Sequence, residues 1–274
     1  MLATPLDIMS NVCYTNNRDC TRRNMNKGVD YIISKMREYS KIPSLTYHEQ
    51  DMLAYLEQDI PTKHYDLDKS NPQCLLYRYK GKTKYLVLAH IDRIEVEEFR
   101  FRRHNGRLTG QLDNVISVAT CRYLIEQGTP VDFLFTTQEE CLQSADQIAW
   151  AYEQCGNDYF VMDMDIDVAL NEKEVMRGVI SLRDKDNLAP YCNEVVKEMR
   201  RICDENEIAY STKDDDWLVC QIGTAIDAVP KIKGMYLGLP IGNYHSHTEY
   251  VLTSCISKMV KLFRCIKKEY NGST

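Results

Sequence analysis

Residues 85–92 read YLVLAHID, an apolar run that leads without interruption into His90 and Asp92. A short continuous run of this kind is typical of a strand buried on both faces of a sheet. Two later stretches follow the same plan: VDFLFTTQEE at 131–140 and YFVMDMDID at 159–167. Each combines an apolar strand with carboxylates at its end, so the three stretches together predict a sheet with a polar edge.

Segments with helical spacing of apolar residues alternate with these strands. They cover residues 115–126 and 141–153, and a last one covers 252–266. Strands that alternate with helices predict an α/β fold: a mostly parallel, mixed β-sheet sandwiched between helices. Between the first two strands, Asn105-Gly106 lies between two short strand-like runs, a strong signal for a β-hairpin.

The chain has 274 residues, of which 44% are hydrophobic, enough for one large core. We find no linker or repeat, and so expect a single domain over residues 29–274. Residues 1–28 are polar and rich in Asn and Arg, which favours an N-terminal arm. A helix is expected to begin near Thr46, because Thr46 and Glu49 have the spacing of a capping box.

The overall charge argues against binding of nucleic acid. The net charge is −6 and the sequence pI about 5.6, whereas nucleic-acid binders are usually basic. We also expect no membrane segment and no signal peptide, because neither pattern is found. The 11 cysteines are scattered without a C-x-x-C pair, which excludes a zinc finger and favours the reducing cytoplasm.

The polar residues at the predicted strand ends are candidate metal ligands. His90 offers a ring nitrogen, and Asp92 can accept the other ring N–H; the simpler alternative is a structural histidine. Asp113 precedes a predicted helix, where it either caps the helix or bridges two metal ions. The pair Glu139-Glu140 allows one carboxylate to ligate a metal while its neighbour acts as a base, although glutamates also suit the first turn of a helix.

Two further segments can complete such a site. The aspartates 163, 165 and 167 alternate along one predicted strand, so that they share a face, and one of them can be a ligand. The turn-rich segment 238–249 offers His245 or His247, with Glu249 as a cap or a polarising group. Mixed nitrogen and oxygen ligands without thiolate suit zinc, and also cobalt or manganese.

The ordered set AHID, LDN, TTQEE, MDMD and NYHSHTE resembles the co-catalytic zinc exopeptidases. That superfamily includes the secreted leucine aminopeptidases, the tetrahedral glutamyl-type aminopeptidases and the carboxypeptidase/acylase group. The resemblance covers roughly residues 70–265, and TTQEE and YHS-x-x-E are its most specific motifs. It implies the zinc exopeptidase (phosphorylase/hydrolase-like) fold and one catalytic domain. Only 22 residues separate His90 from Asp113, which implies a compact form without the domain that the glutamyl-type enzymes insert there.

Carried over residue by residue, the resemblance implies two zinc ions. His90 and Asp163 hold one, with Asp165 as the alternative two positions along. Glu140 and His245 hold the other, with His247 as the competing histidine. Asp113 bridges both ions and is followed by a cis peptide bond.

The resemblance also assigns the catalytic residues: Glu139 is the general base and Asp92 orients His90. It implies a zinc-dependent aminopeptidase that acts on small peptides. An amidohydrolase or deacylase for N-acyl amino acids or other small amides would use the same metal pair, and a binding protein without turnover is the third alternative. Enzymes of this kind occur as monomers and as large assemblies, so a homo-oligomer is compatible with the resemblance.

Overall fold

The structure is a computed structural model that describes residues 26–94, 101–156, 158–168, 170–214 and 218–272. The polar arm expected at 1–28 lies almost wholly outside the described residues, and residues 95–100, before the expected hairpin, also lie outside them. Residues 26–39 form a helix. None of the helices in the described ranges is both long and apolar enough to cross a membrane.

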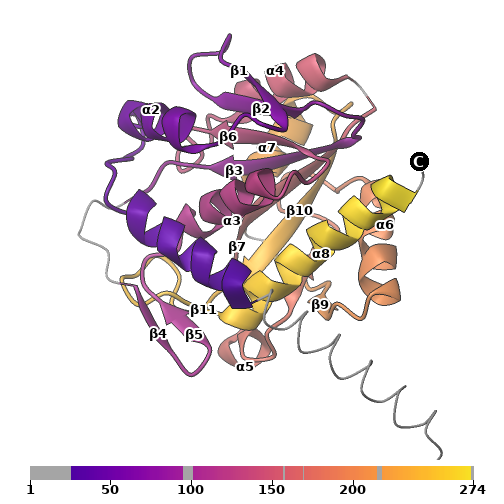
Figure 1. Cartoon of the computed structure of the whole chain (residues 1–274). Helices are drawn as coiled ribbons and strands as arrows, with labels where there is room; N and C mark the ends of the chain where they lie inside the picture. The colour runs from indigo at the N-terminus through magenta and orange to yellow at the C-terminus, as the bar shows by residue number, and fades with distance from the viewer. Residues whose placement is uncertain (1–25, 95–100, 157, 169, 215–217, 273–274) are drawn as a thin grey trace, which may run out of the picture.

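A mixed sheet of eight strands forms the centre of the molecule (Figure 1). The order across the sheet is β1-β2-β6-β3-β7-β10-β8-β9. The four central strands β6, β3, β7 and β10 run parallel, whereas β2 beside them and β8 on the other side are antiparallel. The strands are β1 Tyr65–Asp68, β2 Leu75–Tyr79, β3 Tyr85–His90, β6 Asp132–Thr136, β7 Phe160–Asp167, β8 Ile180–Leu182, β9 Tyr210–Ser211 and β10 Lys233–Pro240.

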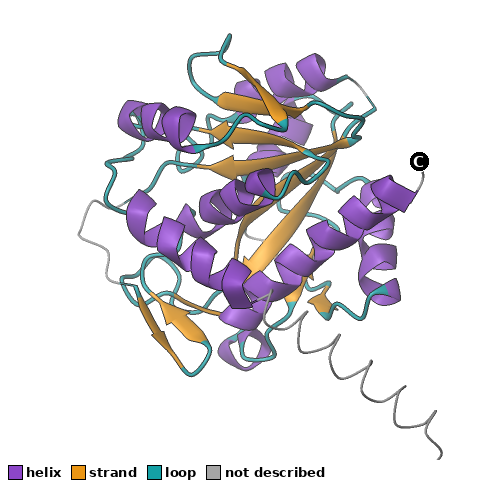
Figure 2. Ribbon diagram, in the orientation of Figure 1, coloured by secondary structure: helices purple, strands orange, loops and turns teal. Residues whose placement is uncertain are grey.

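Helices cover both faces of this sheet (Figure 2), which confirms the predicted fold class. On one face of the sheet, α3 contacts β3 and β7, and α8 contacts α3, α6 and β10. On the other face, α4 and α7 contact each other; α4 also contacts β6, and α7 contacts β7 and β10. The helices labelled in Figure 1 are α2 Gln50–Asp59, α3 Val115–Glu126, α4 Ala145–Cys155, α5 Glu172–Val175, α6 Asn193–Glu205, α7 Gln221–Ala228 and α8 Thr253–Gly272.

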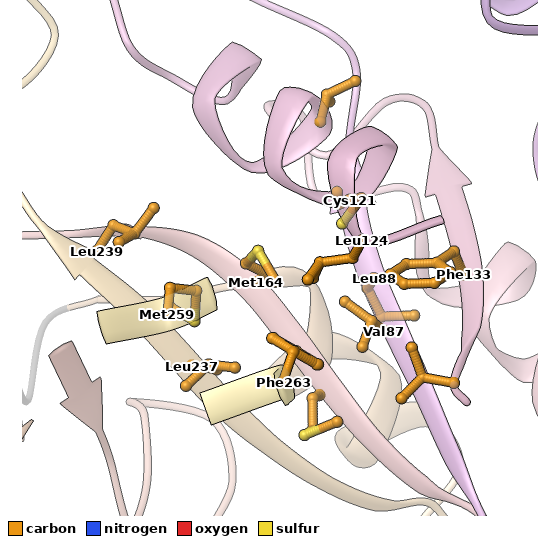
Figure 3. Packing of buried hydrophobic residues seen from close by; sticks show 14 of the residues in the cluster. Val87, Leu88, Cys121, Leu124, Phe133, Met164, Leu237, Leu239, Met259 and Phe263 are labelled. Atoms are coloured by element: carbon orange, nitrogen blue, oxygen red, sulfur yellow. The ribbon is translucent and has the colours of Figure 1, made fainter. Parts of the chain in front are cut away.

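Every residue of β3 and of β7 is buried, as expected for central strands covered on both sides. Figure 3 shows Leu88, Leu124, Met164, Leu237 and Phe263 gathered in one cluster between the sheet and the helices α3 and α8. Full burial of one such side chain contributes about 1.5–3 kcal/mol. The apolar runs of the sequence therefore form the core, and their polar ends are left at the edge of the sheet.

A second, three-stranded sheet lies beside the first and contains the predicted hairpin. Strands β4 Arg102–His104 and β5 Arg107–Thr109 are joined by Asn105-Gly106, both with positive φ (47° and 76°), as a two-residue hairpin turn requires. Strand β11 Tyr250–Leu252 pairs antiparallel with β5. This pairing brings residues 110–113 next to residues 245–249, which are far apart in the sequence.

Some sequence predictions of local structure were wrong. Helix α2 begins at Gln50, and Glu49 makes no side-chain cap to it. Thr46 instead donates to Asp92 Oδ2 (3.2 Å) and Glu49 accepts the Gln138 N–H (3.1 Å), so the expected capping pair is used to hold two other loops. Helix α7 was not foreseen from the sequence.

Candidate metal centre and pocket

The carboxyl ends of parallel strands β3, β6 and β7 meet at one edge of the sheet, where ligands collect in folds of this type. His90 is the last residue of β3 and pairs with Thr136 of β6. On the other side Leu88 pairs with Asp163, so Asp165 is level with His90, two residues further along. The register of the sheet thus brings Asp165 to the histidine.

His90 is fully buried and surrounded by carboxylates. Its Nε2 lies 3.3 Å from Asp113 Oδ1 and 3.5 Å from Asp165 Oδ1, and its Nδ1 lies 3.4 Å from Asp92 Oδ1. Burial alone would lower the pKa of His90, but the surrounding carboxylates, Asp165 first and then Glu139, raise that pKa well above its usual value. One ring nitrogen therefore faces a cluster of anionic oxygens, while the other faces Asp92.

Asp113 lies between the two histidines of the site. Its Oδ1 faces His90, and its Oδ2 lies 3.3 Å from Nε2 of His245. No hydrogen bond is found for Asp113 Oδ1, although that atom is buried. The peptide bond from Asp113 to Asn114 is cis, as the family resemblance implied. A carboxylate with one oxygen directed at each imidazole has the arrangement of a bridging ligand.

Glu139 and Glu140 are held at the site through their backbone. Asp92 accepts the N–H groups of both glutamates (3.1 and 3.0 Å), so one buried carboxylate contacts His90 and the glutamate pair together. Burial, followed by repulsion from Asp113, raises the pKa of Glu140 to about 9. Burial likewise raises the pKa of Glu139 well above its ordinary value.

The two candidate aspartates of β7 have different surroundings. Asp163 is fully buried and accepts the Gln221 side-chain N–H at 2.7 Å and the Ile222 backbone N–H at 3.4 Å. Asp165 points to His90 and lines the open pocket. The structure therefore brings Asp165 to the cluster and turns Asp163 toward α7.

A buried carboxylate behind the cluster joins the two loops that carry Asp113 and His245. Glu249 accepts the N–H groups of Leu112 (2.5 Å) and Asp113 (3.3 Å) on Oε2, and that of His245 (2.8 Å) on Oε1. Burial raises the pKa of Glu249 to about 7. The sequence suggested Glu249 as a cap or polarising group; that it holds both loops depends on the pairing of β5 with β11.

Gln221 was not suggested by the sequence, because α7 was not foreseen. It donates to Asp163 and accepts from Thr136 Oγ1 (2.7 Å), so it cross-links β6, β7 and α7 behind the site. The competing histidine, His247, lies on the exposed part of its loop. His245 is exposed as well, but its Nε2 contacts Asp113 Oδ2.

The cluster fits a metal ion on its own geometry. His90, Asp113 and Glu140 each offer one ligand atom, and these atoms all lie within 4.8 Å of one another. Buried carboxylates with raised pKa values and an oxygen without a hydrogen-bond donor are the features that a bound cation would compensate. The donors are imidazole nitrogens and carboxylate oxygens, which suit zinc, cobalt and manganese.

The cluster opens into a pocket of about 280 Å³. Its polar end contains Asp113, Glu139, Glu140, Asp165 and His245. The remaining lining is apolar or aromatic and comes from the ends of β7 and β10 and from the loops around them. The site thus combines a group of ligands with an adjoining apolar space of modest size.

Comparison with known proteins gives a consistent result. The family model described as M42 glutamyl aminopeptidase matches residues 89–262. No curated protein matches the chain. Among solved structures, an aminopeptidase from the archaeon Desulfurococcus kamchatkensis is 12% identical with a TM-score of 0.72, covering 88% of this chain and 95% of that one.

Two further structures are similar. The TET1 peptidase of Pyrococcus horikoshii, described as assembling into a tetrahedron or a large octahedral shell, is 15% identical with a TM-score of 0.70; the match covers 86% of this chain and 99% of that one. The aminopeptidase PepT of Bacillus cereus is 11% identical with a TM-score of 0.68, and the match covers 89% of this chain and 99% of that one. Likenesses at this level of identity establish the shared fold.

Proposed function

The chain belongs to the M42 glutamyl aminopeptidase family, and from that premise we propose that it removes N-terminal residues from small peptides at the His90–Asp113–His245 cluster. It is a metal-dependent aminopeptidase by family. The observation that carries the proposal for the site is the position of the Asp113 carboxylate. Its Oδ1 lies 3.3 Å from Nε2 of His90, and its Oδ2 lies 3.3 Å from Nε2 of His245.

We propose that two zinc ions, or cobalt or manganese in their place, bind at this cluster. Asp113 would bridge them, His90 with Asp165 would complete one site, and Glu140 with His245 the other. Asp165 replaces Asp163 in this assignment because both oxygens of Asp163 already accept N–H groups from α7. When bound, such metal ions polarise the scissile carbonyl and lower the pKa of water.

The other groups act by moving a proton or by holding a ligand. Glu139 takes the proton of the attacking water and later returns it to the leaving amine, which is the role of a general base and acid. Its raised pKa, due first to burial, favours holding that proton between the two steps. Asp92 Oδ1 lies 3.4 Å from Nδ1 of His90 and would orient that ring so that Nε2 faces the ligand cluster.

The proposal is tested with Glu139→Gln and with a pair of substrates. We expect metal-loaded protein to hydrolyse leucine p-nitroanilide and to leave N-acetyl-leucine p-nitroanilide intact, because an aminopeptidase requires the free amine. Glu139→Gln should lower kcat by about 10²–10⁴-fold with unchanged metal content by elemental analysis. Release of acetate from N-acetyl-leucine, with leucine p-nitroanilide left intact, would support the deacylase alternative. An unchanged kcat in Glu139→Gln would refute the role of Glu139.

Three broader expectations belong to this proposal. We propose that residues 29–274 act as one catalytic domain, and that the protein works in the cytoplasm. A homo-oligomer is also proposed, because the similar TET1 peptidase is described as a large assembly. Light scattering coupled to size-exclusion chromatography tests the last point, and a 31.9 kDa species would contradict it.

A further inference from the structure

We propose that the pocket selects peptides whose N-terminal side chain is apolar, such as leucine or phenylalanine, over those that begin with glutamate or lysine. The inference rests on the proposed aminopeptidase function and specifies its substrate class.

The mouth of the pocket is apolar and exposed. Six large hydrophobic side chains are exposed in the described part of the chain, and three of them, Ile94, Leu142 and Tyr244, line this one pocket. Their exposed fractions are 49%, 47% and 37%. Apolar groups that gather at a concave site, instead of being scattered over the surface, mark a place where an apolar group of a ligand is buried.

The inner wall is also apolar, because its polar atoms already have partners. The Tyr236 hydroxyl donates to the carbonyl of Ile166. The thiol of Cys220 lies 3.1 Å from the Tyr191 hydroxyl and 3.3 Å from Asp186 Oδ2. A ligand that enters this part of the pocket therefore meets the ring of Tyr236, whose hydroxyl already has a partner.

The distribution of charge opposes a charged side chain in the apolar part. Among the described lining residues none is Lys or Arg, and the four carboxylates are all at the ligand cluster. Arg183 lies over the Tyr236 ring (4.8 Å to its centroid), but it is fully buried and paired with Asp167. Among the residues that the structure describes, a glutamate side chain would lose its hydration here without gaining a cation, and a lysine would meet no carboxylate at the inner wall.

The size of the pocket fits one side chain. About 280 Å³ is just below the range of about 300–1,000 Å³ that holds drug-sized ligands. A leucine or phenylalanine residue with its amine and carbonyl at the cluster can therefore occupy the space. Alanine would leave part of the apolar wall in contact with water.

The first test compares alanine, leucine, phenylalanine, glutamate and lysine p-nitroanilides with the metal-loaded enzyme. We expect kcat/KM for leucine or phenylalanine to exceed that for glutamate by about 100-fold or more, and that for alanine by about tenfold, the scale on which apolar pockets discriminate. An active enzyme that prefers glutamate or lysine would overturn the inference while leaving the aminopeptidase function intact.

The second test places a cation at the pocket mouth. Leu142→Lys should raise the ratio of kcat/KM for glutamate over leucine at least about tenfold, because the new ammonium group pairs with the substrate carboxylate. Met176→Lys is the matched control, since Met176 is similarly exposed (51%) and does not line the pocket. It should leave the ratio unchanged. An equal ratio of kcat/KM for glutamate over leucine in the two variants would contradict the apolar wall proposed for the pocket.

Binding of free amino acids separates the two proposals. Calorimetry with metal-loaded protein should give tighter binding of L-leucine than of L-glutamate. If no p-nitroanilide is cleaved and leucine still binds better, the proposed function fails and the selectivity of the pocket stands. Tighter binding of glutamate, or binding of neither, overturns the inference.

Discussion

At the scale of single residues, the site is defined by which carboxylates face the ligand cluster and the pocket. Asp163 and Asp165 belong to the same strand and share a face, yet the first accepts two N–H groups from α7 and the second faces His90. Asp165 Oδ1 also accepts the Ile166 backbone N–H (2.7 Å), but Asp165 lines the pocket whereas both Asp163 oxygens face α7. The two neighbouring aspartates therefore acquire different roles.

This difference predicts unequal effects for the same substitution. Asp165→Asn removes a charged oxygen 3.5 Å from His90 Nε2 and should lower the metal content toward one ion per chain. Asp163→Asn is the matched control: it should retain the metal, and it should lower stability by about 1–3 kcal/mol because its hydrogen bonds to α7 weaken. Elemental analysis and urea denaturation measure both effects. Loss of metal only in the Asp163 variant would restore the assignment implied by the sequence motif.

At the scale of elements, the pairing of β5 with β11 lets one carboxylate hold two loops. Glu249 accepts three backbone N–H groups, from Leu112, Asp113 and His245. It touches no substrate in the proposed reaction and is a positioning residue. Its effect should therefore pass through the geometry of Asp113 and His245.

Glu249→Gln tests this role. The amide nitrogen that replaces one carboxylate oxygen would face a backbone N–H donor, so the two loops should separate slightly. Metal affinity should then fall about 10–100-fold, which is the usual cost of losing a residue that holds the metal ligands in place. Glu57→Gln, a change at an exposed residue, serves as the control. Titration with zinc measures the affinity, and circular dichroism checks the fold. An unchanged affinity would leave Glu249 with a purely structural role.

A second element-scale contact joins three helices through Asp59 at the end of α2. Asp59 accepts from Lys35 (2.5 Å), Tyr39 (2.7 Å) and Arg122 (2.9 Å), which belong to the helix over 26–39 and to α3. Burial alone would raise the pKa of Asp59, but these donors lower it below 3.8. The charged carboxylate therefore stabilises the packing of these helices.

The depressed pKa sets the pH dependence of this contribution. The unfolded chain, with an Asp pKa of about 3.9, takes up the proton first as the pH falls. The stabilisation is therefore complete above about pH 5, begins to weaken as the pH approaches the unfolded pKa, and is lost as the pH drops through the folded pKa. Asp59→Asn should lower the free energy of unfolding by about 1.5–3 kcal/mol at pH 7, and the difference from the parent should shrink between pH 5 and pH 3.

Urea denaturation at each pH measures this difference. Asp158→Asn, at a fully exposed carboxylate, is the control and should change little. A difference between Asp59→Asn and the parent that grows on acidification would contradict the assigned direction.

At the scale of the whole molecule, the site concentrates buried carboxylates where the ends of β3 and β7 meet residues 110–113 and 245–249. A cation bound only by the folded chain stabilises it through mass action. With free zinc at 100 times its Kd, the gain is about 2.7 kcal/mol, or roughly 5–10 °C in Tm for a chain of this size. Chelation should reverse the shift, as measured by scanning calorimetry.

Asp113→Asn provides the control for this global effect. Without the charged oxygen between His90 and His245, the variant should show little rise in Tm with zinc. A rise as large as that of the parent would locate the zinc elsewhere on the chain.

The sequence alone determined much of this architecture. The apolar runs within 85–92 and 131–140 form β3 and β6, Asn105-Gly106 is the hairpin turn, and α3 has the predicted bounds. These features follow from short-range rules, namely hydrophobic periodicity and turn chemistry, which act within a few neighbouring residues. The motifs at the strand ends also named the polar residues of the cluster, since strand ends in parallel sheets meet at one edge.

The tertiary structure alone decided how those residues divide their roles. Thr46 and Glu49 have the spacing of a capping pair, but they bind residues about 45 and 90 positions away. Asp163 and Asp165 are equivalent in pattern, and only the register of β3 against β7 and the position of α7 separate them. A polar side chain takes whichever partner lies within hydrogen-bond reach, and that partner comes from the packing of distant segments, which local sequence does not encode.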